Sequence, residues 1–158
     1  MCGAHATVRG LLGELVARSA LDDRDLIVDM EAGLEHLSRG TGRHVSRFIA
    51  VLEPYYRSME TVRRIVDLAR DLGVGDVRVV TNKIRNDADR DVIRAYCDTH
   101  HLAVIGEIPW DPSLVDAERA GRPPVDAAPD SMAVRAIRAL ATSLSHGEPG
   151  GLSVANTL

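Results

Sequence analysis

An aspartate closes a short apolar run near the N-terminal end of the sequence. Leu26, Ile27 and Val28 form the run, and Asp29 follows it directly. A carboxylate at the end of a buried strand can hold Mg²⁺, often through a water, which is the form of a Walker B strand. Gly33 has no Cβ atom, so the backbone there can approach a terminal phosphate closely. Taken alone, the pattern fits an ordinary strand with a capping aspartate even better.

A polar pair follows a later apolar run. Asn82 and Lys83 come shortly after Val79 and Val80. An asparagine amide both donates and accepts hydrogen bonds, so it matches the N6 and N7 pattern of adenine. The stem of the lysine could lie along the base. A polar turn accounts for the pair equally well.

Two further runs end in loops. Glu53-Pro54 stops the run at 48–52, and Pro109-Trp110-Asp111 follows the run that starts at 103. Backbone groups of the second loop could line a base. Each loop by itself indicates no more than a turn before a helix.

Strands and helices must alternate to position these residues. Apolar runs predict strands at 26–28, 48–52, 77–80 and 103–105, and periodic stripes predict helices at about 8–18, 58–72, 86–101, 111–120 and 133–144. Ser58 is a candidate N-cap, and Asp111 with Pro112 is another. Strands without polar alternation favour a parallel sheet covered by helices on both faces, an α/β fold. Ligands of such sheets bind at the carboxyl ends of the strands.

Composition excludes several classes of protein. The 158 residues carry a formal net charge of −4, which argues against a general nucleic-acid surface. No apolar run approaches the ~20 residues that a membrane span needs, and the N-terminus lacks the pattern of a secretory signal. Cys2 and Cys97 are too few for a disulfide framework, so we expect a cytoplasmic protein.

The order of the strand-end motifs resembles the C-terminal half of the MinD/ParA-type P-loop ATPases. Within them, it is most similar to the accessory ATPases that mature nickel-containing carbon monoxide dehydrogenase. The similarity covers about residues 1–144 and leaves 145–158 as a flexible tail. The segments that carry it are Asp29-Met30-Glu31-Ala32-Gly33-Leu34-Glu35-His36, which is the most specific, Glu53-Pro54 with Arg57, Ser58 and Thr61, Val79 to Lys83, and Ile108-Pro109-Trp110-Asp111 to Pro123.

This resemblance implies a role for the N-terminal motif. Asp29 would be the Walker B carboxylate for Mg²⁺, and Glu31, Gly33 and Glu35 would belong to the switch segment that senses the γ-phosphate. In the family, ATP closes a dimer whose shared face holds the metal or partner site, and hydrolysis reopens it. A homodimer and a metalloenzyme client are therefore expected.

The resemblance also implies a base site. Asn82 would recognise the adenine of ATP or ADP, with Lys83 beside it. Pro109, Trp110 and Asp111 would flank the base.

The family's phosphate loop is missing from the sequence. Neither G-x-x-x-x-G-K-[ST] nor the Lys-Gly-Gly-x-Gly-Lys-Thr variant occurs, and Lys83, the only lysine, follows no glycine-rich loop. Phosphate binding in this fold depends on such a loop, so ATP hydrolysis by this chain alone is not expected. The favoured hypothesis is the distal part of an ATP-dependent switch, with N-terminal strands missing and supplied by a complementary half. The alternative is a non-enzymatic scaffold that pairs with a complete ATPase through an exposed sheet edge.

The family's metal site is also incomplete. Metal-handling relatives carry a Cys-x-Cys pair where only Cys2 stands. Two Cys2 thiolates across a two-fold axis, with His5, could hold Zn²⁺ or Ni²⁺. A cysteine without a metal is the favoured alternative. A small metal carrier built on Cys2 is a third, weaker hypothesis.

Overall fold

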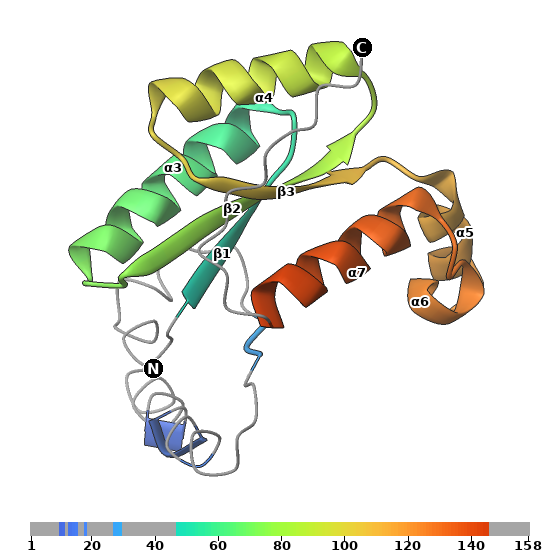
Figure 1. Cartoon of the computed structure of the whole chain (residues 1–158), viewed down its shortest axis with the longest axis horizontal. Helices are drawn as coiled ribbons and strands as arrows, with labels where there is room; N and C mark the ends of the chain where they lie inside the picture. The colour runs from blue at the N-terminus through green and yellow to red at the C-terminus, as the bar shows by residue number, and fades with distance from the viewer. Residues whose placement is uncertain (1–9, 12, 16–17, 19–26, 30–46, 146–158) are drawn as a thin grey trace. The chain divides into compact units, whose positions relative to one another are not determined.

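The computed structural model describes residues 10–11, 13–15, 18, 27–29 and 47–145 (Figure 1). These residues belong to two compact units, one within Met1–Ala50 and Arg63–Val77, the other within Val51–Val62 and Arg78–Leu158. The elements are β1 (Arg47–Leu52), α3 (Tyr56–Asp71), β2 (Asp76–Ile84), α4 (Asp87–Thr99), β3 (Val104–Pro109), α5 (Pro112–Arg119), α6 (Pro124–Ala127) and α7 (Met132–Ser145).

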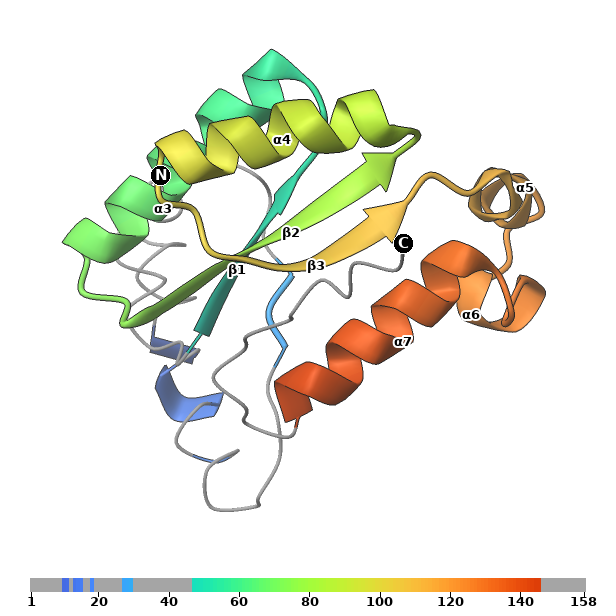
Figure 2. The same ribbon diagram turned by 45° about the horizontal axis from the view of Figure 1, so that its top comes forward.

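The predicted parallel α/β sheet is confirmed. The strand order is β1-β2-β3, and β2 pairs with β3 in parallel (Figure 2). In this pairing Val79 is opposite Val104, and Thr81 is opposite Glu107. Val79 and Val80 are each 1% exposed, and Thr81 is also buried. Successive residues of a strand point to opposite faces. Burial of three in a row therefore requires cover on both faces of β2.

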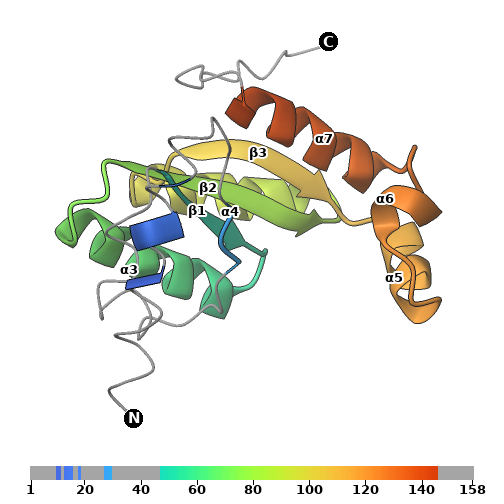
Figure 3. The ribbon, with the colours of Figure 1, turned by 90° about the horizontal axis from the view of Figure 1, so that it is seen from below.

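Helices from the same unit cover the two faces of β2 and β3. The views place α4 on one face and α7 on the other (Figures 2 and 3). Packing between α7 and β3 is close at Gly106, where a Cβ atom would lie 3.2 Å from Cδ1 of Leu140. On the α4 side, Ile93 and Cys97 are buried, as expected for core residues, and burial raises the pKa of the Cys97 thiol to about 11.

Local signals gave most helix boundaries and missed one. The side chain of Asn86 accepts from the Asp89 N–H and caps α4, and Asp111 caps α5. Ser58 is not an N-cap, because α3 already begins at Tyr56. The Ser58 hydroxyl instead accepts a hydrogen bond from the Glu53 backbone N–H, at 2.9 Å. It therefore stabilises the turn between β1 and α3.

The predicted first strand is not formed in the described residues. Ile27, Val28 and Asp29 lie outside any strand or helix, and Ile27 is 90% exposed. An apolar run becomes a strand only when a neighbouring strand pairs with it. The sheet among the described residues contains β1, β2 and β3, and 27–29 pairs with none of them.

Candidate functional site

A β-bulge at the end of β2 shapes the candidate site. Asn82 pairs with Ile108 and Ile84 pairs with Pro109, so Lys83 is an extra residue in the ladder, and its φ is +60°. Side chains of neighbouring strand residues normally point to opposite faces, and a bulge redirects one of them. This explains how Asn82 and Lys83 can both line the same cavity.

An ion pair joins two of the sequence motifs. The Nζ atom of Lys83 lies 2.7 Å from Oε1 of Glu53, directly after β1. The lysine side chain is 45% exposed, so the pair contributes at most about 1 kcal/mol to stability. Its main consequence is geometric, because it fixes where the lysine ammonium lies.

The loop after β3 is held by the carboxylate of Asp111. Its Oδ1 accepts from the N–H and the hydroxyl of Ser113, at 3.0 and 2.6 Å, and its Oδ2 accepts from the Ala133 N–H at 3.3 Å. These hydrogen bonds, that of the Ser113 hydroxyl above all, lower the pKa of Asp111 below its usual value. The carboxylate thus connects the first turn of α5 with that of α7.

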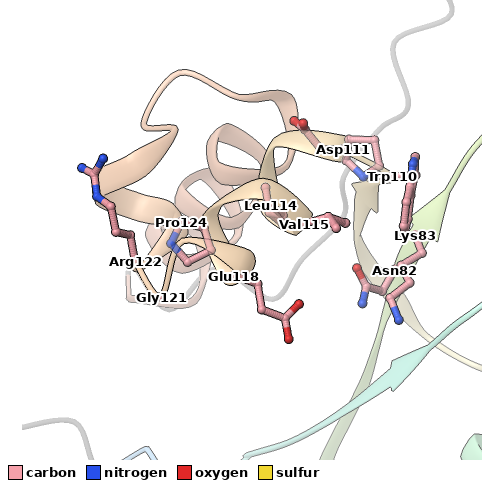
Figure 4. Close-up of a pocket in the computed structure, with 11 residues that line it drawn as sticks. Asn82, Lys83, Trp110, Asp111, Leu114, Val115, Glu118, Gly121, Arg122 and Pro124 are labelled. Atoms are coloured by element: carbon pink, nitrogen blue, oxygen red, sulfur yellow. The ribbon is translucent and has the colours of Figure 1, made fainter.

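A cavity of about 530 Å³ lies where these segments meet (Figure 4). Its size is within the range of small-molecule sites. The cavity is lined by all five residues that were expected to surround a base: Asn82, Lys83, Pro109, Trp110 and Asp111. The remaining lining residues come from α5 and the segment after it: Leu114, Val115, Glu118, Gly121, Arg122 and Pro124.

Sequence reasoning missed the contribution of α5. Leu114, Val115 and Glu118 lie at positions i, i+1 and i+4, which share one face of a helix. Asp111 had already marked the start of that helix, so the shared face was predictable, but its place beside the cavity was not. At the rim, the Arg85 guanidinium lies 4.9 Å from the ring centre of Trp110, a cation–π contact that no motif indicated.

The other expected site residues are not part of this cavity. Asp29 is exposed and belongs to the other unit. Glu31, Gly33, Glu35 and Cys2 lie outside the described residues. Within the described ranges, no group of three or more His, Cys, Asp or Glu side chains could hold a metal ion. Nor is any described helix long and apolar enough to cross a membrane.

Sequence comparison finds relatives among ATP-binding proteins. The chain is 36% identical over 129 residues to the carbon monoxide dehydrogenase accessory protein CooC of Rhodospirillum rubrum, which covers 82% of this chain and 47% of CooC. It is 35% identical over 124 residues to an uncharacterized ATP-binding protein of Methanocaldococcus jannaschii, covering 78% and 47%. The chain therefore spans about half the length of these curated relatives. No protein-family model matches it.

Structural comparison finds the same fold in the cell division ATPase MinD. The Pyrococcus furiosus protein aligns with a TM-score of 0.68 at 22% identity, covering 85% of this chain and 57% of that one. MinD of Pyrococcus horikoshii in complex with Mg-ADP aligns with a TM-score of 0.57 at 17% identity, covering 84% and 55%. At these identities the similarity concerns the fold.

Proposed function

Because this chain belongs to the MinD/ParA-like P-loop ATPases, we propose that it binds ATP or ADP with Mg²⁺. It is similar to CooC and spans about half the length of its curated relatives. The observation that carries the proposal is the cavity beside β2, β3 and α5. This one cavity is lined by all five residues that the motifs assign to the binding of a base.

The cavity lining suits a purine. The Asn82 amide can pair with the N6 and N7 edge of adenine. Because Glu53 holds the ammonium of Lys83, the apolar stem of that lysine is available to the face of the base. Pro109 and Trp110 add apolar surface, as small-molecule sites require.

Mg²⁺ would be held by Asp29. A carboxylate oxygen is a ligand that Mg²⁺ prefers, and phosphates and waters complete its shell in nucleotide sites. The proposal assigns γ-phosphate sensing to the segment containing Glu31, Gly33 and Glu35. When bound, Mg²⁺ would neutralise phosphate charge, while the residues that line the cavity would bind and orient the base.

The role that we propose for the chain is that of the distal part of an ATP-dependent switch in metallocentre maturation. It would act as a dimer or together with a complementary half, and its client would be a metalloenzyme. Its similarity to CooC supports this role. The sequence contains no phosphate-loop motif, so hydrolysis would depend on residues from outside the chain.

A titration tests the proposal with a built-in reporter. Trp110 is the only tryptophan and lines the cavity, so its fluorescence should change when a base enters. We expect MgATP to produce a saturable change, and Asn82→Ala to weaken binding about tenfold by removing a base hydrogen bond. Asn86→Ala is the matched control, since that amide caps α4 and does not line the cavity. No response at millimolar MgATP, or equal affinity in Asn82→Ala, would contradict the proposal.

A nucleotide-free scaffold is the second candidate. One observation favours it: Val51, on an outer strand of the described sheet, is 54% exposed. An apolar residue on an edge strand is suited to pairing with another chain. The scaffold requires the titration above to give no response, so a single experiment separates the two candidates.

A further inference from the structure

The cavity contains two carboxylates with different hydrogen-bonding capacity left for a ligand. Both oxygens of Asp111 already accept hydrogen bonds from Ser113 or Ala133. Glu118, on α5, forms no ion pair with any other described residue, and its carboxylate extends on the side of α5 that faces Asn82 (Figure 4). Of the two carboxylates, Glu118 is therefore the one whose oxygens remain available to a ligand.

We propose that Glu118 determines which purine the cavity accepts, by taking a hydrogen bond from the 6-amino group of adenine. The inference rests on the proposed function, and it assigns to that site a specificity residue that the strand-end motifs do not include.

The polar side chains of the cavity differ in the hydrogen bonds that they can donate or accept. A carboxylate only accepts hydrogen bonds, whereas the Asn82 amide does both and can turn to match either a 6-amino or a 6-oxo purine. Asn82 alone therefore discriminates weakly between the two. Adenine presents a donor at position 6, while hypoxanthine and guanine present an acceptor there. A carboxylate facing a 6-oxo group would place two acceptors against each other.

The cationic groups of the cavity do not cancel this effect. The ammonium of Lys83 is held by Glu53 at 2.7 Å. The guanidinium of Arg122 points away from Asn82, at the opposite end of the cavity (Figure 4). Neither places a donor beside Glu118 that would make a 6-oxo purine equally acceptable.

Binding of MgATP and MgITP to the full chain tests the inference, because these nucleotides differ at position 6 of the base. We expect the unmodified chain to prefer MgATP, by calorimetry and Trp110 fluorescence. Glu118→Gln should narrow the ratio of the two affinities about tenfold, because the new amide can donate to the 6-oxo group. Glu118→Ala should narrow it mainly by weakening MgATP.

The matched control is Asp116→Asn, also an acid-to-amide change on α5. The Asp116 side chain is 76% exposed and does not line the cavity, so the affinity ratio should stay unchanged. An unchanged ratio in Glu118→Gln, or a preference of the unmodified chain for MgITP, would overturn only the role of Glu118 and not the proposed function. If the unmodified chain bound neither nucleotide, the proposed function and this inference would both be wrong.

Discussion

The carboxylate of Asp111 holds together the starts of two helices. It is 9% exposed and accepts hydrogen bonds from Ser113 at the start of α5 and from Ala133 at the start of α7. Hydrogen bonds to a carboxylate favour its ionised form, which is why the pKa of Asp111 lies below its usual value. Although Asp111 lines the cavity, its main role in this chain is to stabilise the starts of α5 and α7.

Replacing Asp111 should therefore affect stability with a specific pH dependence. We expect Asp111→Asn to lower the free energy of unfolding at pH 7 by about 1–3 kcal/mol, because charge-assisted hydrogen bonds are lost. A carboxyl whose pKa is lowered on folding stabilises the protein above about pH 4, its value in the unfolded chain, and loses this contribution as the pH falls through the folded-state pKa. The difference between the two proteins should thus shrink at acid pH.

Urea unfolding at pH 7 and pH 3 measures this difference. Asp116→Asn, at an exposed position on α5, should leave the unfolding free energy nearly unchanged at both pH values. A deficit of Asp111→Asn that is the same at pH 7 and pH 3 would show that the ionised carboxylate is not the stabilising group.

Among the elements, β2 has an irregularity with functional consequences. Lys83 occupies the left-handed region, with φ at +60°, inside a strand. A residue with a Cβ atom pays about 1–2 kcal/mol for that conformation, and a β-branched residue is a stronger outlier. Both Asn82 and Lys83 line the cavity because the bulge is there.

Two substitutions at Lys83 distinguish a bulge from a regular strand. Both Lys83→Gly and Lys83→Val remove the ion pair with Glu53, but only glycine fits positive φ without strain. We expect the valine variant to be less stable than the glycine variant by about 1–3 kcal/mol in urea unfolding. Strand propensity predicts the opposite order. If valine proved the more stable variant, β2 would be regular at this position.

The packing of α7 on β3 depends on the absence of a side chain at Gly106. A Cβ atom there would lie 3.2 Å from Cδ1 of Leu140, so a larger side chain must displace Leu140 or the helix that carries it. Gly106→Val should lower the free energy of unfolding by about 1–3 kcal/mol, since overpacking forces such shifts. Gly106→Ala is the milder companion, because the end of Leu140 can move by a few tenths of an ångström. Thermal denaturation of both variants checks this packing. If Gly106→Val lowered the stability no more than Gly106→Ala, the close packing of α7 on β3 at this position would be contradicted.

For the molecule as a whole, ligand binding should appear as added stability. Any ligand that binds only the folded chain stabilises it by mass action, by about 2.7 kcal/mol at a hundred times its Kd. For a domain of this size, that corresponds to a rise in Tm of about 5–10 °C. We expect MgATP to raise the Tm, and Asn82→Ala to reduce the rise to about half at the same nucleotide concentration, because binding that is about tenfold weaker leaves about 1.4 kcal/mol of added stability.

The control for this measurement is Asn86→Ala, which removes the cap of α4. It should lower the Tm without nucleotide and retain the rise with MgATP, because Asn86 does not line the cavity. If Asn86→Ala reduced the rise in Tm with MgATP as much as Asn82→Ala does, the rise in Tm would not report on binding in the cavity.

The sequence by itself determined the three strands and every helix except α6 between 47 and 145, and five of the eleven residues that line the cavity. Buried parallel strands must be continuously apolar, so 48–52, 77–80 and 103–105 were recognisable from local composition. Helices there have clear apolar stripes and caps such as Asn86 and Asp111. Local chemistry is enough where the signal and the structure lie on the same short segment.

Tertiary structure decided what local chemistry could not. The run at 26–28 has the composition of a strand, but pairing depends on a neighbour, and the described residues form no strand there. The bulge at Lys83 arises from the register between β2 and β3, which neither strand specifies alone. Glu118 lines the same cavity as residues from the ends of β2 and β3, which lie far from it in the sequence. Each of these outcomes depends on contacts between distant segments, and such contacts leave no pattern in a single stretch of sequence.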